Sequence, residues 1–304
     1  MAASRAGDDL DRLLALDPGG RGVTRHAVPG AALAAAHALR RARHVVIVTG
    51  FCVPPGIPET DGPPGAAVLG RALRRLGATV HYVTDPSVRG AMAAAATALE
   101  EPPDVDVYRA TDDAARTLLA REKPSHLIAI ERPGRTASGE YLSARGESIA
   151  SWNSPLDEIF VLGGRRGHRP AVTTIGVGDG GNEIGMGNIR ARLARDGALM
   201  ARLASSVRVD HLVVAGTSNW GAYGIVAALS RLAGKMLLHS PAQERKLIEA
   251  CVDAGAVDGI TRRAEPTVDA LPLDAHAGFV ALLGRAALVP GDRRAQIRRD
   301  ADRV

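Results

Sequence analysis

Residues 171–188 read AVTTIGVGDGGNEIGMGN, and this stretch decides the fold. Its first part, Ala171–Val177, is made almost entirely of β-branched and apolar residues. A near-continuous run of this kind is typical of a strand that is covered on both faces, as in a parallel sheet. Polar residues begin only afterwards, in a turn with many glycines. The stretch therefore predicts a buried parallel strand that delivers a polar loop at its carboxyl end.

Five further runs of the same kind occur along the chain. Each is short, rich in β-branched residues, and bounded by turn residues or by a helical pattern. The runs are His44–Thr49, Thr79–Thr84, Val105–Tyr108, His126–Ile130 and His211–Ala215.

Helical patterns separate the predicted strands. Apolar residues repeat at i, i+3, i+4 and i+7 from Leu69, from Ile225 and from His276, where Asp274 is the expected N-cap. Ser240 opens a capping box with proline at the first helical position. Strands that alternate with helices form βαβ units with right-handed crossovers. We therefore expect an α/β fold: a doubly wound, mostly parallel sheet of about six strands with helices on both faces.

The chain divides into three predicted parts. Residues 1–40 form an N-terminal helical extension, residues 41–290 a single α/β catalytic domain, and residues 291–304 a basic, flexible tail. The stretch 132–154 is a long polar insertion after the fourth strand. Loops of this length in a compact domain are often lids or binding loops.

Composition narrows the classes of function. The net charge of +5 comes from abundant arginine, much of it in the tail, and no aromatic-interleaved basic face indicates nucleic acid binding. No apolar run reaches eighteen residues, and the N-terminus lacks the apolar core of a signal peptide. Two cysteines cannot build a disulfide framework. We expect a bacterial, cytoplasmic protein without nucleic acid or membrane partners, and its oligomeric state is left open, a homo-oligomer included.

Ligands of open parallel sheets bind beyond the carboxyl ends of the strands. The candidate site residues are therefore those that follow each predicted strand. They are Thr49, Gly50 and Asp61 after the first strand, Glu131 and Arg132 after the fourth, Asp179, Gly180, Gly181, Asn182 and Glu183 after the fifth, and Thr217, Ser218 and Asn219 after the sixth.

The loop after the fifth strand admits three other interpretations. Residues 176–181 match the dinucleotide fingerprint GxGxxG, but Asp179 stands where a pyrophosphate would approach and no acidic residue ends the next strand. The loop also resembles the magnesium-binding GDGxND loop of the haloacid-dehalogenase phosphatases, whose nucleophilic DxD ends a strand. The DxD here, Asp104–Asp106, begins one instead. A glycine-rich turn with Asp179 capping the next helix is the third alternative. No organic cofactor is expected.

Taken together, these loops resemble the D-glutamate cyclase family, in particular the C-terminal catalytic region of the larger animal enzymes. The likeness runs from Thr49 to Leu271, and the string GDGGNEIGMGN at 178–188 is its most unusual part. The other matching stretches are 48–51 (VTGF), 59–66 (ETDGPPGA), 128–134 (IAIERPG), 145–149 (RGESI), 155–157 (PLD), 217–221 (TSNWG) and 265–269 (EPTVD).

The resemblance implies a hydro-lyase that converts D-glutamate, or a related amino acid, to 5-oxo-D-proline. Ring closure needs a base for the ammonium, charge stabilisation at the oxyanion, and an acid for the departing oxygen. Glu183 and Glu131 are the candidate acid and base. The amides of Gly180 and Gly181 are candidate oxyanion donors. Asp179 with Glu183 could instead hold one Mg²⁺ or Mn²⁺.

Substrate recognition falls to arginines. Arg145 and Arg132 are the expected clamps for the α-carboxylate because their guanidinium groups are planar and bidentate. The alternatives are an ion pair of Glu131 with one of these arginines, and a solvated Arg145 that pairs with an acidic residue of its own loop. The residues after the sixth strand offer neutral hydrogen bonds, or they cap the next helix.

The site residues also predict how Glu183 responds to substitution. Because no structural partner is evident for Glu183, we expect Glu183→Gln to stop turnover while folding stays intact. A metal-dependent phosphohydrolase and a non-catalytic small-molecule binding protein are the rival functions.

Overall fold

The computed structural model describes residues 9–108, 114–164 and 172–288. Its centre is a six-stranded sheet whose neighbouring strands all run parallel, in the order β5-β4-β1-β6-β7-β8. The strands are β1 (His44–Thr49), β4 (Thr79–Thr84), β5 (Val105–Val107), β6 (His126–Ile130), β7 (Thr173–Gly178) and β8 (His211–Val214). The predicted fold class is confirmed.

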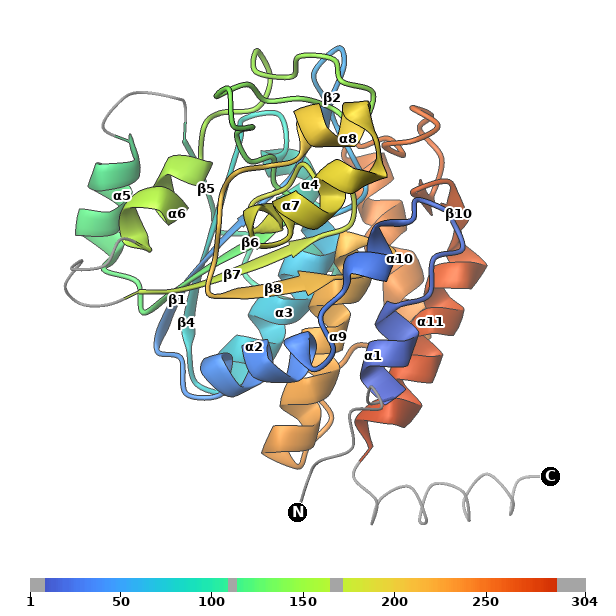
Figure 1. Ribbon diagram of the computed structural model, residues 1–304. Helices are drawn as coiled ribbons and strands as arrows, with labels where there is room; N and C mark the ends of the chain where they lie inside the picture. The colour runs from blue at the N-terminus through green and yellow to red at the C-terminus, as the bar shows by residue number, and fades with distance from the viewer. Residues whose placement is uncertain (1–8, 109–113, 165–171, 289–304) are drawn as a thin grey trace, which may run out of the picture.

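Helices cover both faces of the sheet (Figure 1). In β1, Val45 and Ile47 join the larger core, whereas Val46 and Val48 join the core on the opposite face. The larger core is covered by α1 (Asp9–Leu14), α2 (Ala31–Leu39), α3 (Pro63–Arg75), α4 (Arg89–Ala98), α9 (Ser218–Ala233), α10 (Pro241–Asp253) and α11 (Leu273–Ala287). The other face is covered by α5 (Ala114–Glu122) and α6 (Asp157–Gly163).

Short elements surround the carboxyl edge of the sheet. Two small antiparallel ribbons pair β2 (Cys52–Val53) with β3 (Ile57–Pro58) and β9 (Thr267–Val268) with β10 (Leu271–Pro272). The remaining helices are η1 (Val23–His26), η2 (Met186–Asn188), α7 (Arg190–Leu193), η3 (Ala194–Asp196) and α8 (Ala198–Leu203).

The predicted strands agree with the observed ones to within one residue at most ends, although Ala171 lies outside the described residues. The capping box at Ser240 is present and opens α10. The expected N-cap at Asp274 is wrong, because α11 begins at Leu273 and Pro272 is its N-cap. Proline restricts its own backbone to a conformation that suits a helix start, so the helix begins one residue before the aspartate.

The N-terminal segment is not peripheral to the fold. Its two helices, α1 and α2, pack against α9, and α1 also packs against α11. The division of the chain at residues 40 and 290 stays a prediction, and the expected basic tail lies outside the described residues. Within the described ranges, no helix combines the length and the apolar character that a membrane crossing requires.

Candidate active site

The strand order reverses between β1 and β6, and the site begins at this switch point. Thr49 pairs with Ile130 at the carboxyl ends of these strands, and its hydroxyl donates to the Ile130 carbonyl at 2.8 Å. Glu131 follows immediately, with a positive φ of 43°. Its buried carboxylate accepts a hydrogen bond of 2.6 Å from the Ser218 hydroxyl at the start of α9. The expected substrate contacts of Thr49 are thus replaced by a contact that joins two strands.

The glycine-rich loop after β7 folds around its own glutamate. The Glu183 carboxylate accepts hydrogen bonds from the backbone amides of Asp179 at 3.1 Å, Gly180 at 2.5 Å and Gly181 at 2.7 Å. The proposal that Gly180 and Gly181 donate to a substrate oxyanion is therefore wrong, because Glu183 already occupies both amides. The expectation that Glu183 lacks a structural partner is wrong for the same reason.

We accordingly expect Glu183→Gln to destabilise the fold. Glutamine replaces one accepting oxygen with an NH₂ group that faces backbone donors, so at least one buried amide loses its partner. The cost is about 1–3 kcal/mol of the free energy of unfolding. Urea unfolding measures it, with Glu265→Gln on the exposed 261–265 turn as the matched control. Equal stability of both variants would contradict the structural role.

Asp61 and Asn219 hold the starts of two helices together. The Asp61 carboxylate accepts from the amides of Ser218 at 2.8 Å and Asn219 at 2.9 Å, at the start of α9. In return, the Asn219 side chain accepts from the amides of Gly62 and Gly65 at the start of α3. The side chain of Thr217 caps α9 by accepting from the Trp220 amide. The helix-capping alternative is confirmed for Thr217, whereas Asn219 caps the start of α3 instead of the next helix. These residues organise the helices rather than line the pocket.

Arg132 does not reach the pocket. Its fully buried guanidinium pairs with Asp85, and it also donates to the Gly50 and Ser154 carbonyls. The prediction that Arg132 clamps a substrate carboxylate is therefore wrong, and so is the alternative of an ion pair with Glu131. A guanidinium group can donate hydrogen bonds to several acceptors at once. Here it joins the polar insertion to the residues that follow β1 and β4.

An arginine from the N-terminal segment enters the site, although no sequence pattern predicted it. Arg21 Nη1 lies 2.8 Å from Asp179 Oδ2 and 2.9 Å from Asp269 Oδ2. The Asp17 carboxylate holds the turn by accepting from the amides of Arg21 and Gly22. Asp179 therefore pairs with an arginine that is distant in the sequence, and it does not cap the following helix.

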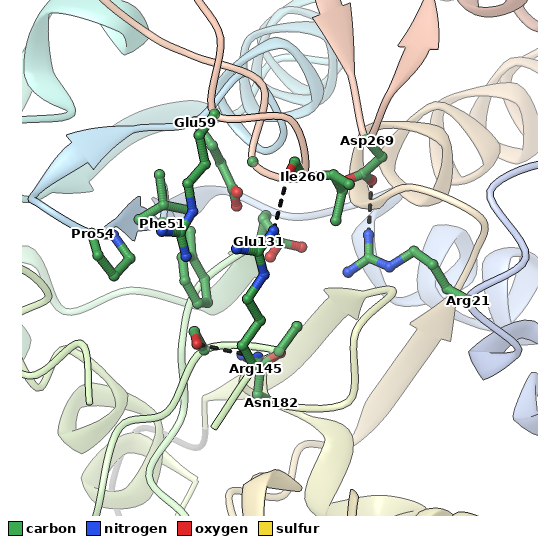
Figure 2. Close-up of a pocket in the computed structure, with 14 residues that line it drawn as sticks. Arg21, Phe51, Pro54, Glu59, Glu131, Arg145, Asn182, Ile260 and Asp269 are labelled. Atoms are coloured by element: carbon green, nitrogen blue, oxygen red, sulfur yellow. Dashed lines mark hydrogen bonds and ion pairs between the residues drawn. The ribbon is translucent and has the colours of Figure 1, made fainter. Parts of the chain in front are cut away.

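A pocket adjoins these groups. Figure 2 shows Arg145 reaching across it toward Ile260, with Glu59 on one side and Arg21 and Asp269 on the other. The residues that line it are Arg21, Phe51, Val53, Pro54, Glu59, Glu131, Ser143, Ala144, Arg145, Asn182, Gly259, Ile260, Arg262 and Asp269. Glu131, Arg145 and Asn182 were predicted as site residues. Glu59 and Asp269 lie in stretches that match the family, although no role was assigned to either, and Arg21 and Arg262 were not predicted.

Two turns meet at the mouth of this pocket. Arg145, at the tip of the turn 143–147, donates through Nη2 to the Ile260 carbonyl at 3.3 Å. In the opposite direction, Arg262 donates to the Glu147 carboxylate at 2.9 Å. Within the described ranges Arg145 makes no ion pair, so the alternative that it pairs with an acidic residue of its own loop is wrong. Both guanidinium groups therefore lie at the mouth of the pocket, where they would meet an anionic ligand.

The carboxylates beneath the mouth are buried and crowded. Burial is the main cause that raises the pKa of Glu131 well above its usual value, and the charges of neighbouring carboxylates add to it. The pKa values of Glu59 and Asp179 are raised for the same main reason, although Arg21 opposes the shift at both. Burial also raises the pKa of Asp61 to about 8. A raised pKa favours the protonated, neutral form of each of these carboxyl groups.

Two sets of carboxylates are close enough to share a cation. Asp61, Asp179 and Asp269 form one set and Glu131, Asp179 and Glu183 the other, and the ligand oxygens in each set lie within 4.8 Å of one another. The buried Oδ1 of Asp179, common to both, has no hydrogen-bond partner. Oxygen donors with a free lone pair fit Mg²⁺ or Mn²⁺.

Comparisons with known proteins agree on one family. A family profile described as "D-glutamate cyclase-like, C-terminal" matches residues 10–284. Human mitochondrial D-glutamate cyclase is 33% identical over 249 residues, which cover 75% of this chain and 39% of that enzyme. The chain therefore spans about two fifths of the length of this relative.

Other likenesses are partial or weak. Ribosomal RNA large subunit methyltransferase H of Stenotrophomonas maltophilia is 36% identical over 72 residues, covering 23% of this chain and 44% of that protein. An exopolyphosphatase-related protein from Bacteroides fragilis covers 87% of this chain and 58% of its own at 8% identity, with a TM-score of 0.40. Neither supports a conclusion. The profile and the human relative do, and the chain belongs to the D-glutamate cyclase-like family.

Proposed function

We propose that this pocket binds D-glutamate and closes it to 5-oxo-D-proline with loss of water, which makes the protein a hydro-lyase. The observation that carries the proposal is that two buried glutamates line the same pocket as Arg145 and Arg262. Glu59 and Glu131 lie inside, where their raised pKa values suit proton transfer. Arg145 and Arg262 stand at the mouth, where a substrate carboxylate would enter.

The reaction moves protons between the substrate and these two glutamates. The α-ammonium gives a proton to one carboxylate, and the freed amine attacks the γ-carboxyl carbon. A C–N bond forms, the ring nitrogen passes its second surplus proton to the departing oxygen, and the C–O bond breaks. That oxygen takes one further proton from the other glutamate and leaves as water, and transfer of a proton from the first glutamate to the second restores both. The negative charge of Glu59 raises the pKa of Glu131, so Glu131 enters protonated and Glu59 ionised. We assign the acid role to Glu131, since Ser218 fixes its orientation.

We further propose that a divalent cation belongs to the site. Asp179 would hold it with Asp61 and Asp269, because Glu131, in the other set of carboxylates, is assigned as the proton donor. When bound, the ion supplies Lewis-acid stabilisation of the developing oxyanion, a role that the loop amides cannot take. The absence of an organic cofactor stays a prediction.

Arg145 is the expected clamp for the α-carboxylate. That group keeps its charge during ring closure, so the clamp stabilises ground state and transition state alike. We expect Arg145→Lys to raise KM and to leave kcat nearly unchanged, with a loss of about 1–3 kcal/mol in binding. Arg145→Ala should cost more, and Arg202→Lys, on a neighbouring exposed helix, is the control. Unchanged KM in both Arg145 variants would remove Arg145 from recognition.

A direct assay tests the proposed function. The purified protein is incubated separately with D-glutamate and L-glutamate, with Mn²⁺ or with EDTA, and 5-oxoproline is measured. We expect turnover of the D-enantiomer that EDTA suppresses. Activity that persists in EDTA would overturn the proposed need for a cation and would leave the proposed reaction intact. Phosphate release from an aryl phosphate, or thermal stabilisation by glutamate without turnover, would instead support the phosphohydrolase or the binding protein.

A further inference from the structure

A second cluster of ligand-bearing side chains lies on the α5 side of the sheet, away from the pocket. His81 comes from β4, Asp106 from β5 and Glu122 from the end of α5. One ligand atom of each lies within 4.8 Å of the others. His81 Nε2 is 2.9 Å from Asp106 Oδ2, and His44 Nε2 on β1 is 3.1 Å from Glu122 Oε2. Three elements therefore bring one imidazole and two carboxylates together, and β1 adds His44 beside Glu122.

The backbone explains why these side chains converge. His81 pairs in register with Val46, two residues beyond His44, and Asp106 pairs with Val83, two residues beyond His81. Successive side chains of a strand alternate between faces, so all three side chains project from the same face of the sheet. Glu122 reaches them because α5 covers that face.

We propose that His81, Asp106 and Glu122, with His44 as the fourth donor, form a binding site for a transition-metal ion of the Zn²⁺ class. Imidazole and carboxylate are ligands that Zn²⁺ accepts, and tetrahedral sites with four protein donors are structural. Bonds of about 2.0–2.2 Å require the three donors to draw closer together than their present separations of up to 4.8 Å, and His44 to move toward them. The bound ion would tie β1, β4, β5 and α5 together.

The Arg121 guanidinium occupies the position that the metal ion would take. Its guanidinium contacts Asp106, lies 2.5 Å from Glu122 Oε1, and comes within 3.4 Å of His81 Nε2. The Arg121 side chain is 49% exposed, so it can leave without unpacking a core. Its guanidinium also lies 5.8 Å from the centre of the Tyr108 ring, which offers it an alternative cation–π contact. A positive group in contact with two carboxylates and one imidazole marks a site that favours cations.

Zinc titration of the tag-free protein tests the proposal. Calorimetry is performed in excess Mg²⁺, which competes for the oxygen-only carboxylates of the active site but not for imidazole. We expect one Zn²⁺ per chain and a rise in the unfolding temperature on binding. His81→Ala and Asp106→Asn should each weaken binding by at least about tenfold. His37→Ala, which removes an exposed histidine on α2, should leave it unchanged.

Arg121→Gln separates a metal site from an ordinary surface ion-pair cluster. Removal of the competing positive charge should tighten Zn²⁺ binding by about tenfold or more. A cluster that serves only as ion pairs would gain no affinity for zinc from this change. The proposal is overturned if zinc binding is absent, if His81→Ala and Asp106→Asn both retain it, or if Arg121→Gln does not strengthen it. The site does not depend on the proposed function, because it lies apart from the pocket.

Discussion

Glu131→Gln is expected to lower kcat for ring closure of D-glutamate by about 10²–10⁴-fold, the range that a positioned acid or base contributes. Glutamine keeps the size of the side chain and can still accept from the Ser218 hydroxyl, but it cannot give a proton to the departing oxygen. Folding should be preserved, since the neutral amide is no harder to bury than a carboxyl group whose pKa burial already raises. Steady-state formation of 5-oxoproline measures the effect.

Two further variants sharpen the test of Glu131. Ser218→Ala removes the hydroxyl that orients the carboxyl group and should lower kcat less than Glu131→Gln does. Glu249→Gln, a surface change on α10, should have no effect. A folded Glu131→Gln protein with near-normal kcat would show that the proton comes from another group, and Glu59→Gln would then be the next variant to assay.

Arg21→Met should produce the largest loss of stability. It leaves Asp179 and Asp269 buried without their shared cation, and breaking a buried pair in this way costs about 3–5 kcal/mol. Turnover should fall as well, because Arg21 lines the pocket. Arg25→Met is the matched control: it removes an exposed arginine of the same segment, paired with Asp196 at the surface, and should change little.

The loss from Arg21→Met should depend on pH, and its sign follows from Asp179. Burial raises the pKa of this carboxyl above its unfolded value, so the folded state binds the proton more tightly. Its contribution to stability is therefore full at low pH and is lost as the pH rises through the folded pKa. Without Arg21 that pKa rises further, so the deficit should grow with pH. Urea unfolding between pH 5 and 9 measures this; a deficit that is constant across the range would contradict the assignment.

Sequence patterns predicted the fold more completely than the site. The strands were predictable because each is a local run of β-branched residues, such as His44–Thr49, whose burial on both faces leaves a continuous apolar signature. The helix at Ser240 was predictable because a capping box uses neighbouring residues. The N-cap prediction at Asp274 was wrong because Pro272, two residues earlier, determines where the helix begins.

The site was predicted only where its residues directly follow strands. Glu131 and Asp179 were found by this rule, and the structure brings them within reach of one another. Arg132 follows the same strand as Glu131, yet it turns toward Asp85, and a residue list cannot show that direction. Arg21 has no strand and no motif beside it, and Asp269 follows only the two-residue strand β9, within a matching stretch to which no role was assigned. Their meeting depends on long-range packing, which no local pattern records.

The position of Arg21 in the sequence also determines when the site can assemble during synthesis of the chain. Its partner Asp179 lies 158 residues further along the chain, and Asp269 comes later still. Since translation proceeds from the N-terminus, the turn with Arg21 leaves the ribosome long before either carboxylate has been made. The complete set of charges can form only after the β9–β10 ribbon has emerged. A ribosome-bound chain therefore remains catalytically incomplete until nearly all of the fold is present.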